Sequence, residues 1–418
     1  MVSVTKQNTP ALRFDGFDGE WHWAKLGDFG RVGMNKRIFK HQTSPTGDIP
    51  FYKIGTFGKT PDAFIPQSLY DAYRAKYPHP SAGTVLISAS GSIGRTLVYD
   101  GQPAYFQDSN IIWLDHNGEL LNSYLEQFYS IANWNGIEGT TIRRLYNEQF
   151  LAVPIPVPPA LEEQQAIGEL FADLDALIEQ RRAKHKKLQQ TKTALMQRMF
   201  PQGGADEPEL RLDGFSGAWE IQPFSDLVAY RGHNSLSRAD LTDVPTSAMN
   251  IHYGDILVKY DSVVDVSQTD IPFVRDVERL SNLSRQSLSD GDILFADAAE
   301  DSTVGKCVEV QGISDNLVLA GLHTISARPI RTFAPGFLGH ALNAPSFHNQ
   351  LLSKMQGTKV SSISISTLAE TVFSFPTPEE QRAIGEVFSN LDALIAAESQ
   401  YITQLTQAKT ALLQRMFV

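Results

Sequence analysis

Two short stretches in the first half of the chain collect side chains that could contact nucleic acid. "SASGSIGR" (Ser88–Arg95) combines hydroxyls, glycines and a guanidinium group, and "TTIRR" (Thr140–Arg144) places two hydroxyls and two guanidinium groups within five residues. Such donors bind phosphate oxygens and base edges. The first stretch is also compatible with a hairpin turn after the strand-like "TVLIS", in which Gly91 and Gly94 supply permissive backbone geometry. The candidate contacts in this half are Ser90, Ser92, Arg95, Thr141, Arg143 and Arg144.

The second half carries weak echoes of both stretches. "DGDILFADAAEDSTVGK" (Asp290–Lys306) repeats the apolar run, the turn and the aliphatic-Gly-basic ending, and "QGTKVSSI" (Gln356–Ile363) resembles "EGTTIRRL" (Glu138–Leu145). A lysine that contacts phosphate would affect the binding of all sequences alike, and Lys306 is the candidate for that role. The corresponding contacts are Lys306, Lys359, Ser361 and Ser362, and secondary candidates near the start of each half are Lys36, Arg37, Arg231, His233, Asn234 and Arg238.

Motifs for catalysis or metal binding are missing from the sequence. The ten histidines form no HExxH pair, and the single cysteine, Cys307, can build neither a disulfide nor a cysteine-rich zinc site. The chain has no GxxxxGK[ST] loop, no GxSxG elbow and no [NDS]PP[YF] motif of the kind that grips a flipped base. We therefore expect no catalytic residue, no bound metal and no cofactor on this chain, and we expect Cys307 to be a small buried apolar residue.

Charge is distributed unevenly along the chain. The net charge is −11, and residues 201–418 carry 15 basic against 27 acidic side chains. This balance argues against DNA binding by the second half unless it has a local patch or a partner, because phosphate contacts need a basic surface. No apolar run approaches the roughly 20 residues that cross a bilayer, and the start of the chain lacks the features of a signal peptide. We therefore expect no membrane association and a cytoplasmic location.

One helix-like segment is written twice. "EEQQAIGELFADLDALI" (Glu162–Ile178) matches "EEQRAIGEVFSNLDALI" (Glu379–Ile395) at 13 of 17 positions, and "TALMQRMF" recurs as "TALLQRMF" at the same offset of 217 residues. Each half also opens on a similar segment, "LRFDGFDGEW" and "LRLDGFSGAW", at an offset of 198. The sequence between these markers differs, so the chain is an internal repeat with divergent domains.

The repeated segments predict two long helices of about 38 residues, roughly 57 Å each. Apolar residues at intervals of three and four form a heptad-like seam, which Glu398 interrupts in the second copy and Arg181 and Lys184 in the first. We expect the helices to pack on one another as an antiparallel pair, although each could instead belong to its own domain's core. Gly168 and Gly385 imply close contacts, because glycine costs a helix about 1 kcal/mol relative to alanine. The seam residues are Ile167, Leu170, Leu174, Leu177, Leu188, Leu195, Ile384, Val387, Leu391, Leu394, Tyr401, Leu405 and Leu412.

The repeated helices, the proline-rich segments before them and the "LRxDGFxGxW" openings resemble the specificity subunit of type I restriction-modification systems. The resemblance implies an α+β chain of two α/β target-recognition domains with curved β-sheets, separated by two long helices in an antiparallel coiled coil, with a pseudo-two-fold internal repeat. The expected boundaries are residues 1–160 and 210–376 for the recognition domains, 161–200 and 377–418 for the helices, and 201–209 for a flexible linker.

The resemblance also implies partners and a role. The expected partners are double-stranded DNA, two methyltransferase subunits and, through the complex, the restriction subunits. S-adenosylmethionine, ATP and Mg²⁺ are expected on those partner subunits. Because the two domains differ in sequence, we expect a bipartite, asymmetric target whose half-sites lie in successive major grooves, about 34 Å apart along B-DNA. The alternative is a non-catalytic coiled-coil scaffold that carries two ligand-binding domains and has no preference for DNA.

Overall fold

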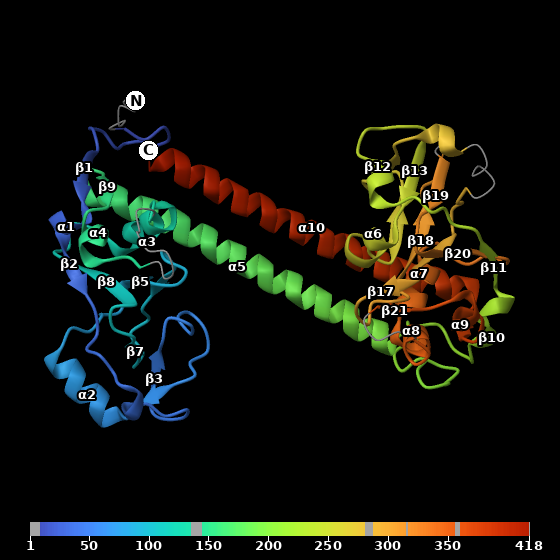
Figure 1. The fold of residues 1–418 in the computed structure, drawn as a ribbon, viewed down its shortest axis with the longest axis horizontal. Helices are drawn as coiled ribbons and strands as arrows, with labels where there is room; N and C mark the ends of the chain where they lie inside the picture. The colour runs from blue at the N-terminus through green and yellow to red at the C-terminus, as the bar shows by residue number, and fades with distance from the viewer. Residues whose placement is uncertain (1–8, 135–143, 281–286, 315–316, 356–359, 418) are drawn as a thin grey trace. The chain divides into compact units, whose positions relative to one another are not determined.

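The computed structural model describes residues 9–134, 144–280, 287–314, 317–355 and 360–417. The chain forms two compact units: residues 1–181 together with 401–418 are unit 1, and residues 182–400 are unit 2 (Figure 1). Each unit contains one half of helix α5 (Leu161–Arg198) and one half of helix α10 (Pro378–Met416). The division therefore cuts across both long helices, and each unit joins the beginning of one helix to the end of the other.

Unit 1 is built on a four-stranded antiparallel sheet in the order β2-β8-β5-β6. A three-stranded sheet, β4-β3-β7, contains the parallel pair β3–β7, and β1 pairs with β9. The central strands are continuous apolar runs, as expected of strands buried on both faces. The strands are β1 (His22–Lys25), β2 (Gly30–Gly33), β3 (Ile49–Tyr52), β4 (Phe64–Ile65), β5 (Val85–Ser88), β6 (Thr96–Val98), β7 (Tyr105–Phe106), β8 (Ile111–His116) and β9 (Pro154–Val157); the helices are α1 (Leu26–Phe29), η1 (Lys40–Gln42), α2 (Gln67–Lys76), α3 (Asn122–Ile131) and α4 (Asn147–Leu151).

Unit 2 repeats this plan with additions. Its main sheet has the order β11-β20-β16-β18-β14, its second sheet the order β12-β15-β13-β19, and β10 pairs with β22 and β17 with β21. The strands are β10 (Glu220–Pro223), β11 (Val228–Arg231), β12 (Leu241–Thr242), β13 (Ala248–Ile251), β14 (Val263–Asp265), β15 (Phe273–Val274), β16 (Ile293–Ala296), β17 (Ala298–Ala299), β18 (Cys307–Gln311), β19 (Leu317–Ala320), β20 (Thr324–Pro329), β21 (Ser361–Ser362) and β22 (Val372–Phe375). The helices are η2 (Phe224–Asp226), η3 (Arg238–Asp240), α6 (Tyr253–Val258), η4 (Val277–Leu280), α7 (Phe337–Asn343), α8 (Pro345–Leu352) and α9 (Ile365–Ala369).

The phenylalanine just after the end of each long helix completes the core of a unit. In unit 1, Phe417 is buried and stacks on Tyr124 of α3 with ring centroids 5.0 Å apart. In unit 2, Phe200 is buried against Phe388, with centroids 5.7 Å apart, and against Trp219. Each hydrophobic core therefore depends on the end of a helix that begins in the other half of the sequence.

The opening segment of each half is hydrogen-bonded to the end of a long helix. The backbone N–H of Leu210 donates to the carbonyl of Arg198 at 2.9 Å, and the N–H of Leu12 donates to the carbonyl of Arg415 at 3.0 Å. Within residues 201–209 the carbonyl of Asp206 also accepts from the N–H of Trp219 at 2.7 Å. This hydrogen bond connects the predicted linker, residues 201–209, to the opening segment of the second half.

An arginine in each opening segment binds a buried glutamate in the first turn of a long helix. Arg13 contacts both carboxylate oxygens of Glu163, at 2.6 and 2.7 Å, and Arg211 contacts both oxygens of Glu380, at 2.8 and 2.7 Å. The hydrogen bond that Arg13 donates to Glu163 raises the pKa of Arg13 above its ordinary value. These bidentate pairs fix the opening segments to the helices.

The two long helices pack on one another within each unit, which confirms the predicted antiparallel pair. In unit 1, Lys409 of α10 binds Asp175 of α5, and in unit 2, Lys192 of α5 binds Asp392 of α10. Because Lys409 and Asp175 match Lys192 and Asp392 at the offset of 217 residues, the repeat conserves the same contact twice.

The polar interruptions of the seam pair with one another. Lys184 forms an ion pair with Glu398, and the Arg181 guanidinium lies 4.6 Å from the ring centroid of Tyr401. Two of the predicted seam residues are exposed, Leu394 at 52% and Tyr401 at 37%, whereas Leu391 is buried. A straight helix drifts by only about 20° per heptad relative to a strict seven-residue repeat, so the exposure of Leu394 does not come from this drift.

Both helix glycines face close neighbours within their own units. A Cβ on Gly168 would lie 2.6 Å from the Cβ of Ser123 in α3, and a Cβ on Gly385 would lie 2.8 Å from the carbonyl oxygen of Pro335. Separations this short are not tolerated, so any larger residue would push the helix away from its domain. The predicted close contacts are confirmed.

Unit 1 carries a half-buried carboxyl group beside the Lys409–Asp175 pair. Burial and the negative charge of Asp175 raise the pKa of Glu126 above its ordinary value of 4.5, and Lys409 opposes the shift. The folded state therefore retains a proton that the unfolded chain releases, so this group's stabilising contribution is complete below pH 4.5 and is lost as pH rises through the raised pKa.

Replacing Glu126 by glutamine should remove this pH dependence. We expect Glu126→Gln to gain stability relative to the unmodified protein as pH rises above 4.5, measured as the free energy of unfolding in urea at a series of pH values. Glu148→Gln changes an exposed carboxyl group and is the matched control. A constant difference between Glu126→Gln and the unmodified protein across this range would contradict the assignment.

Candidate nucleic-acid interface

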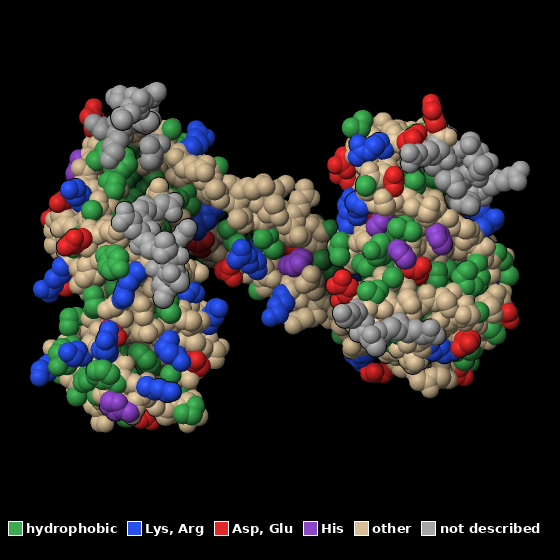
Figure 2. All heavy atoms as spheres, in the orientation of Figure 1, with side chains coloured by type: hydrophobic (Ala, Val, Ile, Leu, Met, Phe, Trp, Pro, Cys, Tyr) green, Lys and Arg blue, Asp and Glu red, His purple; other side chains and the backbone are tan. Residues whose placement is uncertain are grey.

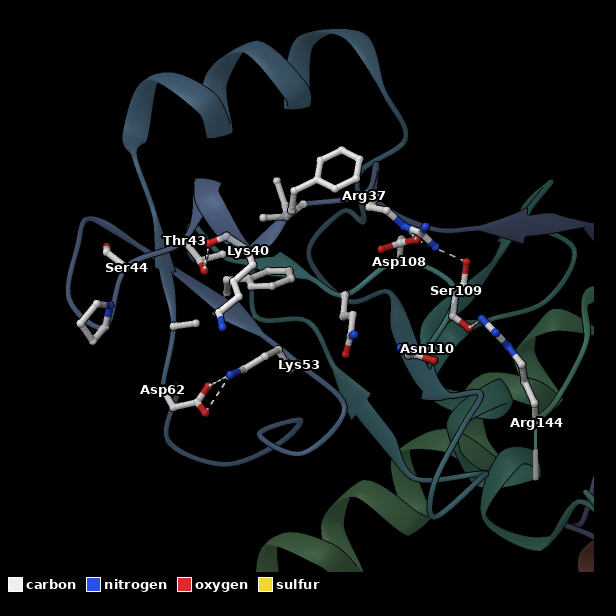
Figure 3. A pocket seen from close by; sticks show the side chains of 16 residues that line it. Arg37, Lys40, Thr43, Ser44, Lys53, Asp62, Asp108, Ser109, Asn110 and Arg144 are labelled. Carbon is white, nitrogen blue, oxygen red and sulfur yellow. Dashed lines mark hydrogen bonds and ion pairs between the residues drawn. The ribbon is translucent and has the colours of Figure 1, made fainter. Parts of the chain in front are cut away.

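A cleft of about 650 Å³ lies between the loop after β2 and the loop that joins β7 to β8 in unit 1. Figure 3 shows the side chains that line it. Cations come from three parts of the chain, namely Arg37 and Lys40 after β2, Lys53 after β3, and Arg144 before α4. The charged and polar residues of the lining are Arg37, Lys40, Thr43, Ser44, Lys53, Asp62, Gln107, Asp108, Ser109, Asn110 and Arg144.

Two of the four cations in the cleft are paired with carboxylates. Arg37 donates to Asp108 at 2.9 Å, and Lys53 contacts Asp62 at 2.8 Å. The Arg144 guanidinium donates to the carbonyl of Ser109 at 2.9 Å, and within the described residues Lys40 has no acidic partner. The cleft thus has a net positive charge, with Phe39 exposed at its edge and stacked on His41. Arginine, lysine, hydroxyl and amide groups gathered in this way suit phosphate and base-edge contacts.

The "SASGSIGR" stretch forms the hairpin between β5 and β6, as the structural interpretation predicts. Ser90 is buried and donates to the side-chain oxygen of Asn110 at 2.9 Å, whereas Ser92 is exposed. Arg95 donates to the carbonyl of Ile54 at 2.8 Å and lies over the ring of Phe57, so its guanidinium anchors the loop that follows β3.

The structure brings the two predicted stretches of unit 1 together. Ser90 and Arg144 form an antiparallel bridge, and the N–H of Leu145 donates to the carbonyl of Ala89 at 2.8 Å. Lys36 is exposed, with its ammonium 5.2 Å from the ring centroid of Tyr77. The predicted contacts Thr141 and Arg143 lie outside the described residues.

Unit 2 has the same arrangement with different side chains. Ser361 and Ser362 in β21 pair with Ala299 and Ala298 in β17, and the N–H of Ile363 donates to the carbonyl of Asp297. The hydrogen bond from Ile363 to Asp297 corresponds to the one from Leu145 to Ala89 in unit 1. The segments whose sequences weakly resemble one another in the two halves therefore form equivalent loops. Lys359 lies outside the described residues.

Lys306 occupies the place of Arg95 and has a similar anchoring role. Its ammonium donates to the carbonyls of Leu257 and Tyr260, at 3.2 and 2.6 Å, and burial lowers its pKa. These contacts hold α6 against the sheet. A phosphate contact by Lys306 would require this ammonium to leave both carbonyls.

The loop after β11 presents the remaining candidates. Arg231 and His233 are exposed, whereas Asn234 is buried and donates to Asn250 at 2.6 Å. Arg238 is half exposed and donates to Asp255 at 2.7 Å. Arg231, His233 and Arg238 are therefore accessible, while Asn234 shapes the loop.

Sequence reasoning missed several cleft residues. Lys40, Lys53, Ser109 and Asn110 belong to no recognisable motif, and only the fold brings them together. Ser109 also has a left-handed backbone conformation, with φ of +61°, which cannot be read from the sequence. Non-glycine residues in this conformation are uncommon and concentrate at functional sites.

Other classes of site find no support among the described residues. No group of three His, Cys, Asp or Glu side chains there could hold a metal ion. No helix in that part of the chain is long and apolar enough to span a bilayer. Cys307 is fully buried, as expected, and burial raises the pKa of its thiol. The fold thus has two similarly built domains, and the equivalent loops of the two domains carry polar or basic side chains.

Comparisons with known proteins give similar results in sequence and in structure. Residues 18–190 match the model of the type I restriction modification DNA specificity domain. A putative type I restriction enzyme specificity subunit from Haemophilus influenzae, S.HindORF215P, is 54% identical over 154 residues, which cover 37% of this chain and 40% of that relative. The MjaVIII specificity subunit of Methanocaldococcus jannaschii is 22% identical over 338 residues, which cover 79% of this chain and 74% of that relative.

Solved structures agree on the fold. A type I restriction-modification S subunit from M. genitalium has a TM-score of 0.55 at 13% identity, with 98% of this chain and 99% of that one covered. A chain from a study of complex assembly and conformational transition of the type I R-M system has a TM-score of 0.53 at 16% identity, with 96% and 98% covered. Residues 18–190 therefore match the type I DNA specificity domain, and the chain as a whole resembles type I specificity subunits in sequence and fold.

Proposed function

We propose that this chain is the DNA sequence-recognition subunit of a type I restriction-modification complex. The observation that carries the proposal is the cleft of unit 1, where four cationic side chains from separate loops meet two carboxylates beside hydroxyl and amide groups. Phosphate contacts by Lys40 and Arg37 would position the duplex, and the polar groups at the base of the cleft would read base edges.

The target is bipartite and asymmetric. Unit 2 offers equivalent loops, but Ser361 and Ser362 stand near the place of Arg144, so the two domains present different chemistry to DNA. Two domains that differ in chemistry select two different half-sites.

The partners are two methyltransferase subunits and, through them, the restriction subunits. The excess acid of residues 201–418 supports this assignment, because a domain with 15 basic and 27 acidic side chains binds DNA weakly without basic neighbours. S-adenosylmethionine, ATP and Mg²⁺ bind those partners, and this chain contributes no catalytic residue. The complex acts in the cytoplasm, without membrane contact.

Binding to DNA with and without partners tests the proposal. We expect weak binding by the chain alone and tight, sequence-selective binding after assembly with methyltransferase subunits, measured by gel shift and fluorescence anisotropy. Indifference to DNA in both states would favour a scaffold that carries two ligand-binding domains.

A charge variant tests the role of the cleft. Lys40→Ala should weaken binding to all sequences alike and reduce the slope of log K against log salt by about 1, as expected for one lost phosphate contact. Lys76→Ala removes an exposed lysine of α2 outside the cleft and is the control. An unchanged salt slope in Lys40→Ala would place the DNA elsewhere.

A further inference from the structure

A short loop of unit 2, residues 321–323, corresponds to the loop that lines the cleft of unit 1. It joins β19 to β20, as residues 107–110 join β7 to β8. The carbonyl of His323 accepts from the N–H of Asp297 at 3.0 Å, and the carbonyl of Asn110 accepts from the N–H of Ala89 at 2.8 Å. His323 therefore occupies the place that Asn110 holds in the cleft.

The backbone of this loop is constrained. His323 has φ of +57°, and among the described residues only Ser109, in the equivalent loop, is another non-glycine residue with positive φ. Gly321 packs so closely on Asn250 and Ile251 that a Cβ would lie 2.6 Å from either. The Thr324 hydroxyl donates to the carbonyl of Gly321 at 2.6 Å. A strained residue held this firmly indicates that the direction of its side chain matters.

The His323 imidazole is oriented and accessible. Its Nδ1 lies 3.0 Å from the Asp297 carboxylate, and the Tyr253 ring meets it edge-on at 5.2 Å. Half of the imidazole side chain is exposed. When Asp297 accepts a hydrogen bond from Nδ1–H, the second nitrogen, Nε2, is left to interact with a ligand. No hydrogen bond to Nε2 occurs within the described residues.

The chemistry fits a base edge better than a phosphate. Asp297 lies next to the imidazole, and its negative charge repels a phosphate group. In the neutral imidazole that carries its proton on Nδ1, Nε2 is an acceptor, which matches the amino groups that adenine and cytosine present in the major groove. A base contact that needs no positive charge also suits a domain with few basic side chains.

We propose that His323, positioned by Asp297, is a specificity-determining contact to the amino group of a base in the half-site that unit 2 reads. The inference rests on the proposed DNA-recognition function and names a residue for it. Asp297 is the positioning residue, because it fixes which imidazole nitrogen carries the proton.

The test uses the chain assembled with its methyltransferase subunits and a DNA pool randomised over both half-sites. Bound sequences are read from the unmodified complex and from His323→Asn, Asp297→Asn and Val258→Ala. Asparagine tolerates the left-handed backbone, so His323→Asn changes the chemistry of the contact and spares the loop. Asp297→Asn leaves His323 in place, and Val258→Ala alters an exposed side chain of α6 as the control.

We expect His323→Asn to change base preference about tenfold at one base pair of one half-site and to leave the other half-site unchanged. Asp297→Asn should relax preference at the same base pair, and Val258→Ala should match the unmodified complex. If both variants keep the original preferences, or weaken all sequences equally, the inference is wrong although the proposed function stands. If the unmodified complex selects no sequence, the proposed function fails and the inference with it.

Discussion

Replacing Phe417 by alanine should lower the free energy of unfolding of unit 1 by about 3–5 kcal/mol, the usual cost of deleting a buried phenyl ring. Phe417 is 1% exposed and contacts Tyr124, Phe128 and Phe171, with ring centroids 5.0 to 6.5 Å apart. Its removal leaves a cavity where α3, α5 and the end of α10 meet. Because Phe417 follows the last residue of α10, we also expect that end of the helix to lose its protection from amide hydrogen exchange.

Two further variants make this result specific. Phe200→Ala removes the matched residue of unit 2 and should cost a similar amount there, because Phe200 packs on Phe388, Trp219 and Phe337. Gln414→Ala changes an exposed residue of the same helix turn as Phe417 and should cost little. Chemical denaturation with hydrogen exchange assigns each loss to its unit. A Phe417→Ala protein as stable as Gln414→Ala would show that the end of α10 does not complete the core.

Replacing Arg13 by methionine should destabilise unit 1 by about 3–5 kcal/mol, because it leaves a buried carboxylate without its cation. The side chain of Glu163 is fully buried, and Arg13 supplies two of its hydrogen bonds, at 2.6 and 2.7 Å. The indole N–H of Trp21 supplies a third, at 3.3 Å, which cannot compensate for the lost charge. The free energy of unfolding in urea measures the loss.

A double variant separates charge from packing. Arg13→Met combined with Glu163→Gln removes both charges, so we expect it to recover much of the stability lost in Arg13→Met alone. Arg211→Met should behave like Arg13→Met in unit 2, because Arg211 binds Glu380 with the same geometry. If the double variant is no more stable than the single one, lost packing by the Arg13 side chain explains the effect instead.

The sequence predicts the long helices well because their signal is redundant. Two copies of one segment, each with regular apolar spacing, identify α5 and α10 and their pairing, and even the interruptions at Lys184 and Glu398 turn out to be partners. The exposure of Leu394 could not be predicted, because apolar spacing alone does not show which seam residues the opposite helix covers.

The candidate site is predicted less well because its residues are distant in the sequence. Ser90 and Arg144 were both candidates from the sequence, but nothing in the sequence reveals that they pair with one another or that Lys53 lines the same cleft as Arg144. Arg95 and Lys306 were selected for their charge. In the structure both side chains donate to backbone carbonyls. The charge of a residue does not show whether it will bind a carbonyl or DNA.

The central claim is that one chain carries two different DNA-recognition domains. The most direct test is to map methylated bases in a genome that expresses this chain with its partner subunits. The account predicts methylation within a split motif whose two halves differ in sequence and are separated by a fixed number of unspecified base pairs. A palindromic motif, or a methylation pattern that does not change when this chain is deleted, would contradict it.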